Sequence, residues 1–106
     1  MSAQLARRYL FSVERYERMV KAGILTPDDK LELIEGELLR KMTLGSRHAA
    51  RVNRLNRMFS RLYADVAIVS VQNPVRLDRS EPEPDIALLR LRDDYYESGH
   101  PRPADI

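Results

Sequence analysis

The sequence has no cysteine, no tryptophan and only two histidines among its 106 residues. The lack of cysteine excludes disulfides and thiolate metal sites, and two histidines argue against a zinc site built from protein ligands. No apolar run approaches the roughly 18 residues that a membrane-spanning helix needs. Arg7 and Arg8 interrupt the apolar residues near the N-terminus, which argues against a secretory signal. We therefore expect a cytoplasmic protein without membrane attachment.

Several catalytic motifs are missing as well. The chain has four glycines, and they form neither a glycine-rich phosphate loop nor a GxSxG nucleophile elbow. An HExxH pair is also lacking. The formal net charge of +2 implies no affinity of the whole chain for nucleic acid, so any such affinity requires local clustering of charge. The length and the hydrophobic fraction of 43% predict a single domain over residues 1–106 with a modest core.

The most informative segment present is SEPEPDIALL, residues 80–89. Pro82 and Pro84 oppose helix formation, so we expect the chain to be extended where it reaches Asp85. An apolar run follows at once, so Asp85 lies at the entrance of a predicted strand over 85–90. A carboxylate there is costly unless it is paired, hydrogen-bonded or metal-bound. Asp85 is thus the first candidate for chemistry, and a carboxylate that caps a turn is an equally weighted alternative.

The first half of the chain has helix and hairpin patterns. Residues 11–22 predict an amphipathic helix that Ser12 caps and Gly23 ends, with Tyr16, Met19 and Val20 on its apolar stripe. Residues 26–29 predict a single helical turn. Residues 31–42 predict a hairpin that turns at 35–36, because a glycine between two apolar runs favours a tight turn. A continuous helix is the alternative there.

A long helix is predicted from about Arg47 to Ala64, capped by Ser46. Helical periodicity divides it into two faces. The apolar face consists of Val52, Leu55, Phe59, Leu62 and Tyr63. The nearly opposite face consists of Arg47, Arg51, Arg54, Arg57 and Arg61.

The second half of the chain favours strands. Residues 66–71 form a strong strand pattern, and 74–78 either continue it or form a neighbouring strand. Residues 103–106 resemble the entrance to a further strand, which would leave an apolar edge of the 85–90 strand unpaired. Because such edges invite pairing between chains, we expect a homodimer or a larger homo-oligomer.

Three further groups of residues are candidates for chemistry. His48, in the first turn of the long helix, could bind a metal, accept a proton or orient a carboxylate, although a histidine satisfied within the core is the favoured interpretation. The hairpin acids Glu32, Glu35 and Glu37 could converge on a cation with Asp85, or form a solvated turn. Arginines of the long helix, represented by Arg47, Arg51 and Arg54, could contact phosphates, although a solvated helix face is the more usual meaning.

The order of these segments resembles the Uma family of restriction endonucleases, in the PD-(D/E)XK nuclease superfamily. The resemblance lies in five stretches that cover nearly the whole chain. They are FSVERYERMVKAGIL, KLELIEGELLRKM, SRHAARVNRL, AIVSVQNPVRLDRSEPEPDIALL and DDYYESGHPRPADI. The combination of ELIEGE, the helix histidine and EPEPDIALL is specific, whereas no single stretch is.

The resemblance implies an α+β, restriction-endonuclease-like fold with helices on one side of a small, mostly antiparallel sheet. It implies a metal-dependent DNA endonuclease in which Asp85 binds Mg²⁺ or Mn²⁺ and His48 assists. Glu35 and Glu37 match hairpin acids of less certain role. The family continues past a PADI-like segment to a glutamate and a lysine that this sequence lacks. We therefore expect an N-terminal half that does not cleave DNA alone; a non-catalytic oligomerising or nucleic-acid-binding module is the alternative.

Overall fold

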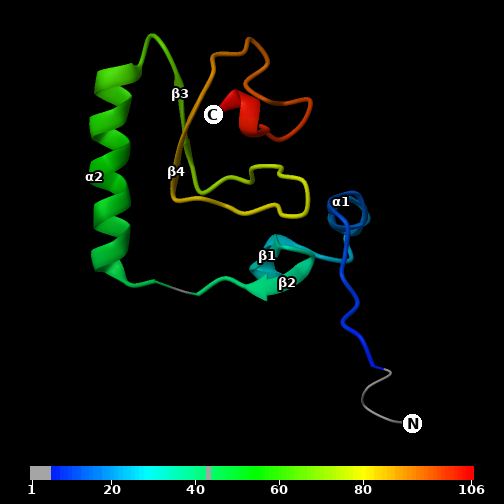
Figure 1. Cartoon of the computed structure of the whole chain (residues 1–106). Coiled ribbons are helices and arrows are strands. Elements are labelled where there is room, and N and C mark those ends of the chain that lie inside the picture. The colour runs from blue at the N-terminus through cyan, green and yellow to red at the C-terminus, as the bar shows by residue number, and fades with distance from the viewer. Residues whose placement is uncertain (1–5, 43) are drawn as a thin grey trace.

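The computed structural model describes residues 6–42 and 44–106. The protein contains two α-helices and two antiparallel two-stranded sheets, which confirms the α+β class (Figure 1). Short 3-10 turns η2 and η3 complete the described elements. In chain order the elements are α1 (Val13–Lys21), η2 (Pro27–Asp29), β1 (Leu31–Ile34), β2 (Glu37–Arg40), α2 (Ser46–Tyr63), β3 (Ile68–Val71), β4 (Ile86–Leu89) and η3 (Pro103–Asp105).

Helix α1 forms where the sequence predicts it and contributes to the core. The Ser12 hydroxyl accepts a hydrogen bond from the Arg15 amide at 3.1 Å, which satisfies a free donor at the helix N-terminus. Val13 and Tyr16 are buried against Leu33 of β1. Along the predicted apolar stripe Tyr16 is buried and Met19 half-buried, whereas Val20 is 46% exposed, because the narrow β1–β2 hairpin does not cover it.

The predicted hairpin is confirmed, and the alternative of a continuous helix is wrong. Strands β1 and β2 pair antiparallel and join at Glu35 and Gly36, whose φ angles are 47° and 81°. Two successive left-handed residues suit a two-residue hairpin turn. A Cβ at Gly36 would lie 2.8 Å from the Leu10 Cβ, so glycine is also required by the packing of the N-terminal segment.

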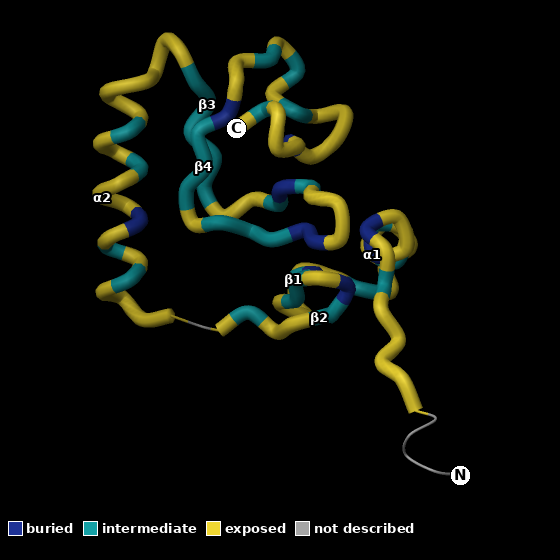
Figure 2. The backbone as a smooth tube through the Cα atoms, in the orientation of Figure 1, coloured by how far each residue is buried: buried dark blue, intermediate teal, exposed yellow. Residues whose placement is uncertain are grey.

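A loop from the second sheet connects it to this hairpin. The Glu81 amide donates to the Leu33 carbonyl at 2.7 Å, and the Gly36 amide donates to the Arg79 carbonyl at 2.9 Å. The Ser80 hydroxyl accepts a hydrogen bond from the Glu35 amide at 2.8 Å. These bonds fasten residues 79–81 along the hairpin, as the adjacent tubes in Figure 2 show. The hairpin and the β3–β4 sheet are thereby held together.

Helix α2 packs against β3 and β4 along one side (Figure 1). Its N-cap is Gly45, and Ser46 is the first helical residue, so the predicted Ser46 cap is wrong. Val52 is the buried residue of the helix. The predicted apolar face is covered only in part: Phe59 is half-buried, but Leu55, Leu62 and Tyr63 are 40%, 64% and 38% exposed. A two-stranded sheet is too narrow to cover the whole face that helical periodicity marks as apolar.

The β3–β4 sheet is shorter than predicted. Ile68 pairs with Leu89 and Val71 with Ile86, so the ladder ends where Asp85 begins. The prediction of a strand at 74–78 is wrong: the Val75 amide donates to the Pro82 carbonyl at 2.9 Å, within an irregular loop. Pro74 lacks an amide donor, which weakens any ladder at this point.

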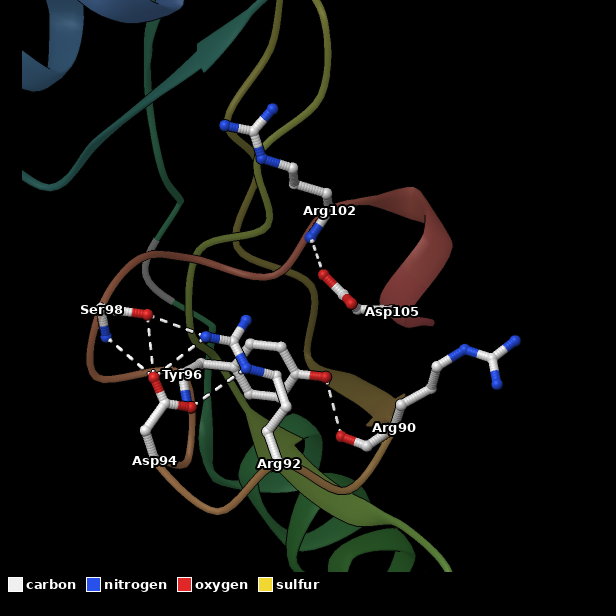
Figure 3. Close-up of polar contacts among 7 residues, drawn as sticks. All are labelled: Arg90, Arg92, Asp94, Tyr96, Ser98, Arg102 and Asp105. Carbon is white, nitrogen blue, oxygen red and sulfur yellow. Dashed lines mark hydrogen bonds and ion pairs between the residues drawn. The ribbon is translucent and has the colours of Figure 1, made fainter.

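The C-terminal segment 91–106 folds through side-chain bonds rather than strands (Figure 3). Asp94 accepts hydrogen bonds from Arg92 Nε at 3.0 Å and from the Ser98 hydroxyl at 2.8 Å. The Tyr96 hydroxyl donates to the Arg90 carbonyl at 2.7 Å. Residues Pro103–Asp105 form a 3-10 turn, so the predicted strand entrance there is wrong. Proline at the first position of this turn favours helical over strand geometry. Within the described ranges, no helix is long and apolar enough to cross a membrane.

Glu81 is a titratable residue in this core, only 5% exposed, and its Oε1 has no hydrogen-bond partner among the described residues. Burial, the largest cause, and the neighbouring carboxyl of Glu17 together raise the pKa of Glu81 from its ordinary value of 4.5 to about 8, while Arg76 opposes the shift. The carboxyl group is therefore neutral in the folded protein near pH 7.

Because the folded pKa of Glu81 exceeds its unfolded value, the folded state binds the extra proton between about pH 4.5 and 8. Its contribution to stability is complete below pH 4.5 and is lost as the pH rises through 8. We predict that Glu81→Gln raises the melting temperature at pH 9 relative to wild type and flattens its fall between pH 5 and pH 9. Thermal unfolding followed by circular dichroism measures this. Asp78→Asn, at an exposed site, is the control; an unchanged pH slope in Glu81→Gln contradicts the prediction.

Asp94 organises the C-terminal loop, because it accepts hydrogen bonds from Arg92, from the Ser98 hydroxyl and from the Tyr96 backbone amide. The bonds from Ser98 and Arg92 lower its pKa to about 2. We predict that Asp94→Ala speeds amide hydrogen exchange and proteolytic cleavage within residues 92–99, since its acceptors hold several donors of that loop. The matched control is the neighbouring Asp93→Ala. Equal exchange rates in the two variants would show that Asp94 does not hold the loop.

Candidate functional site

A cavity of about 570 Å³ lies between the β1–β2 hairpin, the start of α2 and residues 83–85, which form the approach to β4. It draws charged side chains from four separate segments of the chain. The charged and titratable residues that line it are Lys30, Glu32, Lys41, His48, Glu83 and Asp85. Met42, Leu44 and Ala49 contribute apolar walls. This is the site at which the structure gathers candidate catalytic groups.

Asp85 reaches the cavity because the end of β3 holds its backbone. Gln72 follows β3 and has a φ of 53°. Its backbone N–H donates hydrogen bonds to the backbone carbonyls of Pro84 and Asp85, each at 3.1 Å. Two prolines keep the preceding segment extended, as the sequence predicts. The Asp85 side chain is 48% exposed, so its carboxylate faces the cavity with access to solvent.

His48 and Asp85 are brought together at this cavity. The His48 Nε2 lies 3.0 Å from the Asp85 Oδ2, and this nitrogen is buried. The pair lies at contact distance without hydrogen-bond alignment, since Nε2 has no hydrogen-bond partner among the described residues. The first turn of α2 supplies the histidine. His48 is thus directed at a carboxylate, whereas the sequence favoured a core histidine.

A second charged pair lies in the same cavity. The Lys41 ammonium is 2.6 Å from the Glu83 Oε2, and the Glu32 carboxylate accepts a hydrogen bond from the Glu83 amide at 3.0 Å. Of the hairpin acids, Glu32 is therefore the one that lines the cavity. Sequence reasoning missed Lys41 and Glu83 as candidates. The signal that could have found Glu83 is its place between two prolines, two residues before Asp85.

The other candidate residues lie elsewhere. Glu35 sits in the hairpin turn, exposed and 2.6 Å from the Arg79 guanidinium, and Glu37 pairs with Arg8. Neither lines the cavity that Asp85 enters. The remaining candidates, Arg47, Arg51 and Arg54, are exposed on α2.

The donor set for a metal ion is incomplete in the part of the chain that the structure describes. No group of three or more His, Asp or Glu side chains there could hold one. Asp85 can offer a single exposed carboxylate, while Glu83 is paired with Lys41. Chemically, the cavity combines a carboxylate for a cation with ammonium groups of Lys30 and Lys41 that attract anions.

Comparisons with known proteins identify one family. Residues 13–106 match the model of the family described as "Uma2: Putative restriction endonuclease". No curated protein and no solved structure matched the chain. The match spans all the helices and strands described above, including the elements that bear His48 and Asp85. The chain therefore belongs to the Uma2 family, as its segment order predicted.

Proposed function

We propose that this chain carries the Asp85 side of a metal-dependent DNA endonuclease site with a restriction-endonuclease-like fold. Membership of the Uma2 family supports the reaction class. The single observation that carries the assignment of residues is the 3.0 Å contact between His48 and Asp85 in the charged cavity. The Asp85 carboxylate lies at the entrance of a strand, partly exposed and beside the His48 imidazole. Such a carboxylate could release the imidazole and bind a cation in its place.

Each residue of the cavity has a distinct proposed role. Asp85 supplies one oxygen ligand to Mg²⁺ or Mn²⁺, which would activate water and neutralise charge on a phosphodiester when bound. His48 is a positioning residue, because its ring lies against the Asp85 carboxylate and limits its rotation. Lys41 places a positive charge where a phosphate oxygen could approach, with Glu83 as its resting partner. Glu35 and Glu37 lie outside the cavity, and we assign them no part in binding the metal.

One carboxylate holds Mg²⁺ poorly, since protein sites for this ion usually combine carboxylates with waters and substrate phosphates. We therefore propose that the chain by itself binds the metal weakly and does not cleave DNA. This separates two quantities that an assay can measure, namely metal affinity at Asp85 and turnover.

We predict that Mn²⁺ binds this chain weakly and that Asp85→Asn abolishes the binding, because the amide removes the anionic ligand. His48→Ala should weaken it by about 10-fold, the loss typical of a group that orients a ligand. Isothermal titration calorimetry measures both. Asp93→Asn removes an exposed carboxylate outside the cavity and should bind as wild type does. Wild-type affinity in Asp85→Asn would place the metal elsewhere.

A second candidate function is that of a non-catalytic, oligomerising module. An apolar hollow of about 530 Å³ lies along β4, and its apolar lining residues include Leu77, Ile86, Leu88 and Ile106. Strand β4 pairs only with β3 in the described part of the chain, so its other edge has no strand partner there. Apolar surface beside a free strand edge favours association with another copy.

We predict a homodimer at micromolar concentration, measured by light scattering on a size-exclusion column. Leu77→Lys should shift the mass toward that of the monomer, because it places a charge in the apolar hollow. Leu91→Lys, at another exposed leucine outside the hollow, is the control. A monomeric wild type at high concentration would exclude the second function.

A further inference from the structure

Helix α2 has an unusual distribution of charge. Its 18 residues include five arginines and no acidic residue. All five arginine side chains are exposed, and none takes part in an ion pair or side-chain hydrogen bond within residues 6–42 and 44–106. Some other arginines of the chain differ in this respect, since Arg76, Arg79 and Arg92 each pair with a carboxylate. The helix therefore presents uncompensated positive charge.

The arginines form a continuous row. Successive members are three or four residues apart, so each lies beside the next on the helix surface. At 1.5 Å per residue, the row from Arg47 to Arg61 extends about 21 Å. The row lies opposite Val52, the buried residue that marks the face toward β3 and β4. Figure 2 shows the far side of α2 as exposed along its length.

Folding does not account for this row. Like charges three or four residues apart destabilise a helix by about 0.2–0.5 kcal/mol per pair. Arg47 also lies near the helix N-terminus, where the helix dipole disfavours positive charge. A glutamate at alternate sites would have stabilised the helix and kept it soluble. The row thus carries a cost that a partner of opposite charge would offset.

The row is also separate from the candidate metal site. No arginine of α2 lines the cavity that contains Asp85 and His48. Instead, Arg54, Arg57 and Arg61 border a hollow of about 390 Å³ on the helix surface, together with Met58 and Leu62. His48 and the arginine row therefore lie on different sides of the helix.

We propose that this outer face of α2 is a docking surface for the phosphate backbone of duplex DNA, independent of metal and of Asp85. An extended row of charge suits a polyanion with one phosphate per 3.4 Å of each strand. Guanidinium groups bind phosphate through two parallel hydrogen bonds, which favours arginine over lysine at such a surface. The choice of DNA over RNA rests on the proposed function. A membrane surface is disfavoured because the exposed apolar residues of the hollow are only Met58 and Leu62.

Fluorescence anisotropy with a labelled duplex of about 20 base pairs tests the proposal, in EDTA and across about 50–200 mM salt. The triple variant Arg54→Gln, Arg57→Gln, Arg61→Gln should bind at least about 10-fold more weakly and lower the salt slope by about 2 to 3. The control is Arg7→Gln, Arg18→Gln, Arg40→Gln, which removes the same charge from exposed arginines elsewhere. It should lose much less affinity.

Two features of the experiment keep the outcomes distinct. Because the duplex titration runs in EDTA, it needs no metal at Asp85, so a failed metal titration leaves this proposal intact. The arginine triple variant should unfold at an unchanged or higher temperature, because like-charge repulsion is removed. Equal losses in the two triple variants would overturn the proposal. So would binding of wild type to phosphatidylserine vesicles without binding to the duplex.

Discussion

The backbone pairing between residues 79–81 and the β1–β2 hairpin is the interaction on which the rest of the structure depends. It consists of main-chain bonds at Leu33 and Gly36 and of the Ser80 side chain. These bonds join two sheets that are otherwise separate. Glu83 and Asp85 follow directly along the chain, so the same pairing decides where both carboxylates lie. The cavity exists because the hairpin supplies one wall and the approach to β4 supplies the other.

This junction buries a titratable carboxyl group at some cost. Glu81 donates its amide to the hairpin while its side chain is buried beside Glu17. Burial and a neighbouring carboxyl keep it protonated near neutral pH, and Arg76 compensates by bonding to Glu17 at 2.6 Å. Beside the apolar contacts of Val13 and Tyr16, α1 is thus linked to the rest of the protein by a cluster of Glu17, Arg76 and Glu81. Glu81 is close to Asp85 in the sequence, but the Glu81 side chain is buried beside Glu17, whereas the Asp85 side chain lines the cavity.

Helix α2 carries two different chemistries on its two sides. The inner side places His48 against Asp85 and Val52 against the sheet. On the outer side every charged residue is an arginine, and scattered apolar residues are exposed there. A single helix can therefore contribute both to the proposed cation site and to the proposed anion-binding surface without mixing their charges. Separation by the helix diameter, about 10–12 Å with side chains, limits the repulsion between a bound cation and the arginine row.

The sequence by itself determined the local structure. The Ser12 cap, the turn at Glu35 and Gly36, the extent of the long helix and the extended entry to Asp85 all follow from short-range propensities that neighbouring residues decide. Tertiary structure decided the rest. The contact of His48 with Asp85, the pairing of Lys41 with Glu83 and the exposure of Leu55 and Leu62 depend on how wide the sheet is and on which loops meet. Periodicity identifies a face of a helix, but only the packed fold decides what, if anything, covers it.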